Sequence, residues 1–280
     1  MSKLTTIIRM AVLAAFMIAA TPSFGQAYKE TFNEATEAAK AKNYSVAIQK
    51  FTEAADGAKA EGDSAVERQA RGLVARIEYN LGRALHQQEK FAEAMKHFSN
   101  GIEQDPTFAK NYLARAAAMK KTAEWDQAVL AYQQAMQVAE QNADSQTARA
   151  AESAIRDQYI YMASSALSRS GNRATRADAT EAMEHLDMLQ MYVEADADTY
   201  YYMAEANKVL GNFEQAIALA DQGLEIHRGS RTDKAKIYFV KGEALMNSGQ
   251  TEAAKEAFQN ALFGSYRASA EHYIETLGTN

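Results

Sequence analysis

The 280-residue chain contains no cysteine, only two prolines, one tryptophan and 14 glycines. The missing cysteine excludes disulfide bonds, thiolate metal sites, cysteine nucleophiles and lipid attachment at an N-terminal cysteine. Because proline interrupts helices and only Pro22 and Pro106 occur, long helices are favoured. No run of alternating β-branched residues is long enough to predict a strand. A hydrophobic content of 47% suffices for a substantial core, in one large domain or two ordinary ones.

Positive charge is also scarce, since 30 Lys and Arg residues stand against 36 Asp and Glu residues and the net charge is −6. A nucleic-acid-binding protein is expected to carry a basic stripe. The only adjacent basic pair is Lys120–Lys121, which a solvated helix face explains. The charge balance therefore argues against a nucleic-acid partner.

The first 25 residues have the pattern of an export signal. Two basic residues, Lys3 and Arg9, come before an apolar run of eleven residues, Met10–Ala20. A helix that crosses a bilayer needs about 20 apolar residues, so this run is too short. We expect a cleaved signal peptide over residues 1–25 and no stable membrane insertion after cleavage; an uncleaved membrane anchor is the alternative.

Small residues follow the apolar run at the spacing of a cleavage site. Ser23 and Gly25 occupy the −3 and −1 positions relative to Gln26. Cleavage is therefore predicted before Gln26, with cleavage after Ala20 or Ala27 as the alternatives. The mature protein is expected to be periplasmic or secreted.

A pattern of small and aromatic residues recurs in the chain after 34 residues. A fixed period of this kind predicts stacked helical hairpins, which present a binding surface rather than chemistry of their own. The first copy consists of Gly82, Leu85, Phe91, Ala94, Phe98 and Gly101, and the second of Ala116, Met119, Trp125, Ala128, Tyr132 and Ala135.

This pattern resembles the tetratricopeptide repeat, a helix–turn–helix unit of 34 residues. The resemblance implies an all-α solenoid, a right-handed superhelix of about six hairpins with a C-terminal capping helix. Small residues such as Gly82, Ala94 and Gly101 are expected where the two helices of a hairpin approach most closely. The repeats are predicted near residues 28–61, 64–107, 108–141, 145–195, 197–230 and 231–265, with the capping helix over 266–277, in one solenoid domain over 26–280.

Two first helices are predicted to be longer than the family's usual length. The pattern Ser64-x-x-Glu67 reads as a capping box, so one helix is expected from Ser64 to about Gln87. The other is expected from Asp144 or Ser145 to about Ser170. These extensions either carry an added function or are tolerated insertions.

The resemblance also implies that the first helices line a concave groove. Its first half is predicted to be basic and its second half aromatic, which suits a peptide with carboxylates for the arginines and side chains that stack on the tyrosines. Alternatively, tyrosines at helical spacing are packing residues, and of the three residues 200–202 Tyr200 is the first choice for the core. The candidate groove residues are Arg76, Tyr79, Asn80, Arg83, Lys110, Tyr161, Tyr201, Tyr202, Glu205 and Phe239.

Some members of the family clamp a C-terminal carboxylate with a set of lysine, asparagine and arginine residues. Asn80 and Lys110 match two of those positions, whereas Phe32, Thr36 and Ala114 occupy others. The clamp is incomplete, so recognition of chaperone tails is not supported.

No catalytic or metal-binding motif is present in the sequence: the five histidines are scattered, and no HExxH, GxSxG, P-loop or GxGxxG occurs. We therefore predict a non-catalytic protein–protein interaction scaffold of the bacterial periplasm or envelope, without catalytic residues, metal or cofactor. The partner is a peptide or protein, and self-assembly is a variant of this hypothesis. The alternatives are capture of a small molecule or glycan in a pocket closed by the long helices, and an undetected hydrolase.

Overall fold

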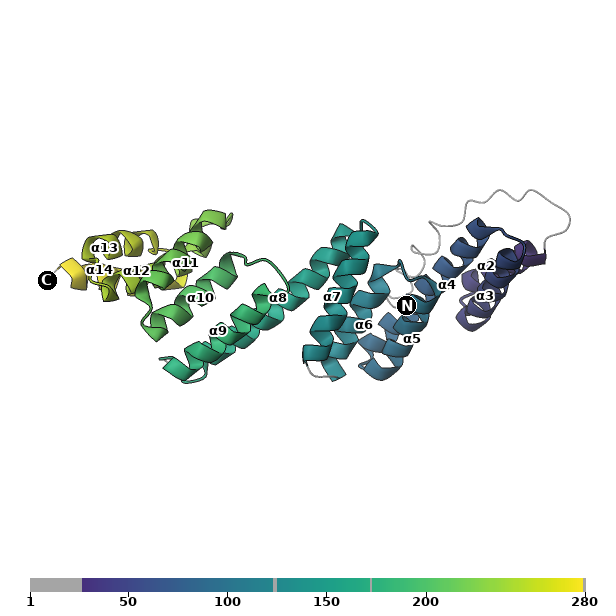
Figure 1. The fold of residues 1–280 in the computed structure, drawn as a ribbon, viewed down its shortest axis with the longest axis horizontal. Helices are drawn as coiled ribbons and strands as arrows, with labels where there is room; N and C mark the ends of the chain where they lie inside the picture. Colours follow the sequence, from purple (N-terminus) through teal and green to yellow (C-terminus); the bar gives the residue numbers. More distant parts are fainter. Residues whose placement is uncertain (1–26, 123–124, 172, 279–280) are drawn as a thin grey trace. The chain divides into compact units, whose positions relative to one another are not determined.

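Helices account for all regular structure in the described part of the chain. The computed structural model describes residues 27–122, 125–171 and 173–278, which form thirteen α-helices and one 3-10 helix, without a strand. The predicted all-α class is confirmed (Figure 1). The helices are α2 (Ala27–Lys40), α3 (Tyr44–Ala60), α4 (Ser64–Gln87), α5 (Phe91–Gln104), α6 (Ala109–Thr122), α7 (Trp125–Gln141), α8 (Ser145–Ser168), α9 (Arg176–Gln190), α10 (Ala197–Leu210), α11 (Phe213–Ile226), α12 (Arg231–Asn247), α13 (Thr251–Asn260), η1 (Gly264–Tyr266) and α14 (Arg267–Gly278).

The predicted signal peptide, residues 1–25, lies outside the described residues. None of the helices in the described ranges combines the length and the apolar character that a membrane crossing requires.

Consecutive helices pack as hairpins. Helix α2 packs on α3, α4 on α5, α6 on α7, α10 on α11 and α12 on α13. Second helices also contact the first helix of the next hairpin, as α3 contacts α4 and α5 contacts α6. Short turns join the helices, and several contain a residue with positive φ: Gly211 has φ 85° after α10, whereas Glu89 adopts φ 60° after α4. Glycine suits such a position because it has no Cβ.

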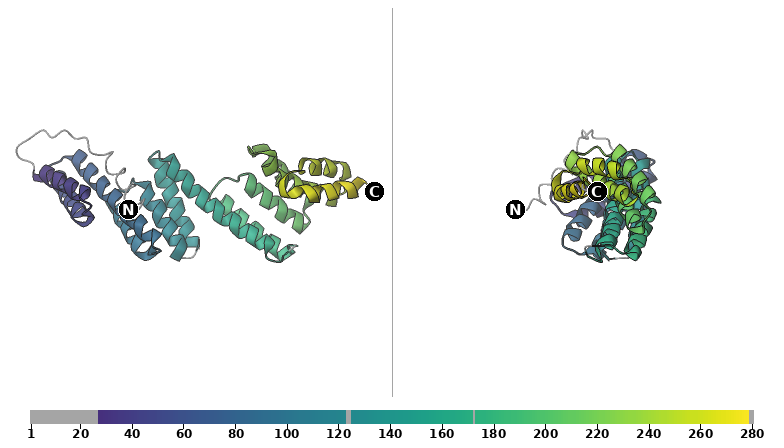
Figure 2. Two further views of the ribbon diagram at one scale, coloured as in Figure 1. Left: turned by 180° about the vertical axis from the view of Figure 1, so that it is seen from behind. Right: turned by 90° about the vertical axis from the view of Figure 1, so that its left-hand side faces the viewer.

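The hairpins belong to two compact units, residues 1–152 and 153–280, called here the N-terminal and C-terminal units. Helix α8 begins in the first and continues in the second. In the N-terminal unit the hairpins α2–α3, α4–α5 and α6–α7 lie side by side (Figure 2). The prediction of a single solenoid domain over 26–280 stays a prediction.

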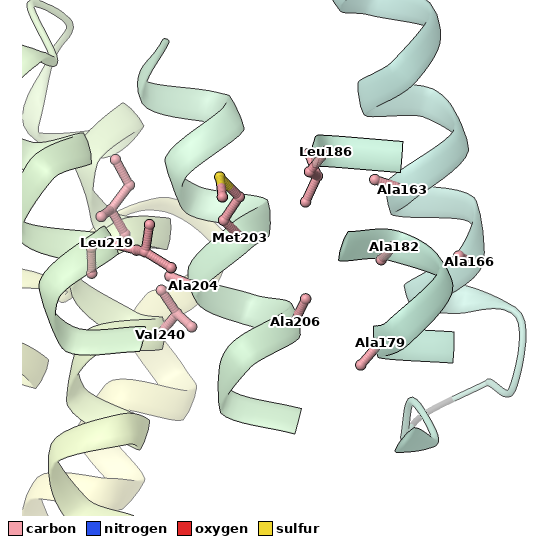
Figure 3. Packing of buried hydrophobic residues seen from close by; sticks show 12 residues of the cluster. Ala163, Ala166, Ala179, Ala182, Leu186, Met203, Ala204, Ala206, Leu219 and Val240 are labelled. Atoms are coloured by element: carbon pink, nitrogen blue, oxygen red, sulfur yellow. The ribbon is translucent and has the colours of Figure 1, made fainter. Parts of the chain in front are cut away.

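Buried alanines dominate the core of the C-terminal unit. Figure 3 shows Met203, Ala204 and Ala206 of α10 between the side chains of α8 and α9 and those of the following helices. Small side chains allow three layers of helices to approach closely, and the few larger ones fill the gaps between them. The other labelled residues of this cluster are Ala163, Ala166, Ala179, Ala182, Leu186, Leu219 and Val240.

Glycine is required where the two helices of a hairpin meet. A Cβ added to Gly82 of α4 would lie 2.5 Å from the ring of Phe98 on α5, and one added to Gly242 of α12 would lie 2.7 Å from the ring of Phe258 on α13. The predicted close approach is confirmed for these two hairpins. Gly101 is different, because its added Cβ would collide with the buried Asn111 of α6, in the next hairpin. The side chain that limits the size of residue 101 thus belongs to the next hairpin, and the predicted close approach of Gly101 to the first helix of its own hairpin stays a prediction.

The two long helices have the predicted extent, but α4 does not have the predicted cap. Helix α4 begins at Ser64, and its N-cap is Asp63, whose carboxylate accepts a hydrogen bond from the Val66 N–H at 3.1 Å. Glu67 pairs with Arg71 at 3.3 Å instead of closing a capping box. The capping-box prediction is therefore wrong; the negative charge of Asp63 additionally favours the helix N-terminus.

Helix α14 covers the apolar end of the C-terminal unit. The ring of Tyr273 stacks on Phe258 with centroids 4.8 Å apart, and Ala270 is fully buried. The opposite side of the helix is exposed and mostly polar, with Glu271 and Glu275. This arrangement fits the predicted capping helix, because a terminal helix needs a polar outer face.

The glycine contacts predict opposite effects for two glycines of helix α4. Gly82→Ala is expected to destabilise the protein by about 1–2 kcal/mol, because overpacking against Phe98 outweighs the gain in helix propensity. Gly72→Ala is expected to stabilise it by about 0.5–1 kcal/mol, because the nearest atom to its added Cβ, an oxygen of Asp105, is 3.6 Å away. Urea unfolding followed by circular dichroism measures both changes. Equal effects of the two substitutions would contradict the close contact at Gly82.

Candidate functional site

A cleft of about 270 Å³ opens between helices α4 and α6 of the N-terminal unit. Its apolar lining includes the buried Phe98 of α5, whose ring packs against Gly82 of α4. Tyr79 stands against Phe108, with ring centroids 5.7 Å apart in an edge-to-face arrangement. The cleft is lined by Tyr79, Arg83, His86, Gln87, Phe98, Lys110, Leu113, Ala114 and Ala117.

Arg83 of α4 and Lys110 of α6 line this cleft, and a third cation, Arg76, lies two turns before Arg83 on α4. The guanidinium of Arg83 lies over the ring of Tyr79, 5.5 Å from its centroid, which holds the charge at the cleft. Within the described residues, Arg76, Arg83 and Lys110 form no ion pair with a carboxylate. The carboxylate that Lys110 influences is Asp144, whose pKa is lowered mainly by the hydrogen bond from Thr147 and to a smaller extent by the lysine charge.

One side chain of the cleft holds a polar atom without a partner. The Nε2 atom of His86 is buried and makes no hydrogen bond to any described residue. The imidazole packs edge-to-face on Phe91, with ring centroids 5.0 Å apart. An unpaired buried nitrogen costs free energy, and a ligand that supplies a partner recovers it.

The predicted aromatic residues of the C-terminal unit pack mainly on one another. Tyr201 contacts the ring of Tyr202 at 4.8 Å, and its hydroxyl lies 3.5 Å from that of Tyr266. Burial raises the pKa of the Tyr201 hydroxyl. Phe239 lies among Phe258, Tyr266 and Tyr273, at centroid distances of 5.2–5.8 Å. Tyr266 of η1 thus lies against Tyr201 and Phe239, and Tyr273 of α14 lies against Phe239.

Glu205 of the C-terminal unit is held by an internal charge network. The ammonium of Lys208 lies 2.7 Å from Glu205 and 2.6 Å from Glu243, and the three side chains are between 16% and 27% exposed. Tyr273 also donates a hydrogen bond to Glu243 at 3.3 Å. Burial lowers the pKa of Lys208, but the two carboxylates more than offset this effect, so its pKa is raised overall.

The ten predicted residues therefore separate into distinct surroundings. Tyr79, Arg83 and Lys110 share the α4–α6 cleft, whereas in the C-terminal unit Tyr201 and Tyr202 pack against one core cluster and Phe239 against another. Three further residues lie apart from these two sets: Tyr161 is 65% exposed, Arg76 is exposed and Asn80 is half-buried. A role in binding stays a prediction for all ten.

The sequence did not predict the residues that shape the surroundings of the candidate residues. The small residues Ala114 and Ala117 make room for the cleft, and Tyr266 closes over Tyr201. Tyr266 begins the segment 266–277, whose helical spacing was a signal for a capping helix but not for the residue that Tyr266 would contact.

A family profile described as Tetratricopeptide repeat matches residues 75–108 and 235–262. These segments contain the two close contacts in which Gly82 meets Phe98 and Gly242 meets Phe258. The match supports tetratricopeptide repeats in this chain. Domains of this family generally act as non-catalytic modules that bind protein partners. No curated protein matches the sequence.

Three solved structures illustrate how distant the likenesses are. The APC/C hetero-tetramer Cut9–Hcn1 is 15% identical over 91% of this chain and 46% of that chain, with a TM-score of 0.38. A thermophilic TPR protein from Thermus thermophilus is 12% identical over 91% and 100%, with a TM-score of 0.32. A TPR repeats protein from Bacteroides fragilis is 16% identical over 91% and 99%, with a TM-score of 0.38. The chain spans about half the length of the Cut9–Hcn1 chain, and none of these likenesses carries over a partner.

The Lys208 network predicts unequal costs for removing two lysines of the C-terminal unit. Lys208→Met is expected to lower the free energy of unfolding by about 2–3 kcal/mol at pH 7, because two carboxylates then face each other without a cation. This loss is somewhat smaller than that for a fully buried ion pair. Lys241→Met is the matched control, since its one partner, Asp221, is 53% exposed, and its cost is expected to be below about 1 kcal/mol.

Unfolding in urea as a function of pH tests this difference. Because the folded pKa of Lys208 is raised, its contribution is complete below the ordinary value of 10.5 and declines only above it. The wild type should therefore keep this contribution from about pH 7 to about pH 10. A Lys208→Met protein as stable as Lys241→Met would show that the network contributes little.

Proposed function

We propose that this chain is a non-catalytic protein-interaction scaffold that binds a peptide or protein segment along the first helices of its N-terminal unit. The observation that carries the proposal is the α4–α6 cleft, where the apolar surface of Tyr79 and Phe98 adjoins the cations Arg83 and Lys110. These cations have no carboxylate partner among the described residues. A partner that brings carboxylates would pair with them and cover the apolar floor.

The size of the cleft favours a side chain of a larger partner over a free small molecule. Small-molecule sites are typically clefts or cavities of about 300–1,000 Å³ that bury most of the ligand's surface. The α4–α6 cleft is about 270 Å³ and opens on the helix surface. A protein segment can add contacts along the rest of the two helices, which a small ligand cannot reach.

We also propose that the scaffold works in the periplasm or envelope of a bacterium after export. The support is the basic start, the eleven-residue apolar run and the small residues before Gln26. Expression with secretion and intact-mass measurement tests this part: the mature chain is expected to begin at Gln26. A chain that retains Met1 in the cytoplasm would contradict it.

Site-specific photo-cross-linking tests the binding face directly. A benzophenone amino acid is placed at Arg76, which is exposed on α4, and for comparison at Glu93, which is exposed on α5. Irradiation in envelope extract is expected to give a protein adduct from position 76 that is absent from position 93. The adduct should weaken at least several-fold when Arg83→Gln is added, because the cleft then loses a cation.

Two results would count against the proposal. Adducts of equal yield from positions 76 and 93 would show that contact is not confined to this face. An adduct whose mass is twice that of the chain would identify self-assembly rather than a separate partner.

A further inference from the structure

Positive charge is concentrated on the two helices that form the α4–α6 cleft. Helices α4 and α6 together contain eight Lys and Arg side chains and two acidic ones, Glu67 and Glu78. Glu67 pairs with Arg71, and the buried Glu78 lies 2.5 Å from His97 on α5. This local excess occurs in a chain whose net charge is −6. The eight basic residues are Arg68, Arg71, Arg76, Arg83, Lys110, Arg115, Lys120 and Lys121.

The C-terminal unit shows the opposite arrangement on its first helices. Lys208 pairs with Glu205 and Glu243, Lys236 pairs with Asp198 at 2.7 Å, and Lys241 pairs with Asp221 at 2.5 Å. These lysines are occupied by carboxylates of the chain itself. The arginine and lysine of the α4–α6 cleft have no such partner within the described residues, so their donors remain available to an external acid.

The floor of the cleft fits one apolar side chain. Leu113, Ala114 and Ala117 of α6 face Tyr79 and Phe98 across the cleft. The volume of about 270 Å³ suits a single bulky side chain better than a longer apolar stretch. Arg83 and Lys110 lie on the two helices that form its walls.

We propose that the α4–α6 cleft recognises an acidic protein segment through an apolar anchor residue, such as leucine, flanked by Asp or Glu side chains. The anchor enters between α4 and α6, and the flanking carboxylates pair with Arg83 and Lys110. This inference rests on the proposed function and specifies the chemistry of its partner. The apolar lining of the cleft, in which Tyr79, Phe98 and Leu113 take part, favours a protein segment with an apolar side chain over a phosphate backbone alone.

Fluorescence anisotropy with defined peptides tests the proposal. The probe is the fluorescein-labelled peptide Gly-Asp-Glu-Leu-Glu-Asp-Gly with a blocked C-terminus, so that only side-chain carboxylates contribute. Two comparison peptides replace either the leucine by serine or the four acids by their amides. Full-length wild type is expected to bind the probe and to bind each comparison peptide at least about tenfold more weakly. Binding of the probe should also weaken as salt is raised.

Variants of the chain assign the binding to the cleft. Arg83→Gln and Lys110→Gln are each expected to weaken binding of the probe about tenfold, whereas Lys59→Gln, which changes an exposed cation on α3, should leave it unchanged. Circular dichroism establishes that each variant is folded. Equal binding of the amide peptide, equal binding by Arg83→Gln, or tighter binding of a single-stranded oligonucleotide of similar length would each overturn the proposal.

The outcome remains distinguishable from failure of the proposed function. If the probe does not bind but Arg83→Gln still removes the photo-adduct at position 76, the scaffold function stands and the acidic-anchor chemistry is wrong. If neither occurs, the binding face itself is wrong.

Discussion

The structure depends on the very short distance between the helices of each hairpin. At Gly82 and Gly242 the space for a Cβ is taken by the rings of Phe98 and Phe258. Elsewhere in the core the contact residues are alanines, many of them completely buried, such as Ala47, Ala128 and Ala216. A close approach of this kind admits few large side chains, so each hairpin combines small residues with one or two aromatic rings.

This constraint leaves long polar side chains on the outward faces of the first helices. There they either pair with charges of the chain itself or remain available to a partner, and the two units of this protein differ in this respect. The C-terminal unit pairs its lysines with its own carboxylates, as Lys208 does with Glu205 and Glu243, and packs Tyr266 of η1 and Tyr273 of α14 against its aromatic residues. The N-terminal unit keeps Arg83 and Lys110 beside an apolar cleft without such pairing among the described residues. We therefore place the proposed binding role in the N-terminal unit.

The sequence predicted the helices well because their signals are local. The spacing of alanine and aromatic residues, the turn glycines and the scarcity of proline specify each hairpin, and even the unusual extent of α4 was predicted from Ser64 to Gln87. The fine detail of its N-terminus was not, because Asp63 and Ser64 are both good caps and only the backbone geometry decides between them.

The candidate site was predictable only where neighbouring first helices both follow the repeat closely. Tyr79, Arg83 and Lys110 stand in regular repeats, and the structure brings them to one cleft. Tyr201 and Phe239 were predicted by the same repeat positions, but η1 and α14 lie against them through Tyr266 and Tyr273. Which side chains a terminal helix covers depends on its tertiary packing, and periodicity within one helix does not report it. Gly101 shows the same limit, since its size is set by Asn111 of the next hairpin.

The most direct test of this division between the units is hydrogen–deuterium exchange of the full chain with and without the acidic leucine peptide. Binding at the cleft should slow backbone exchange in residues 73–87 and 109–117 and leave residues 197–247 unchanged, because ligand contacts suppress local opening of the helices they touch. Protection confined to α10–α12, or none in α4 and α6 at saturating peptide, would contradict the account.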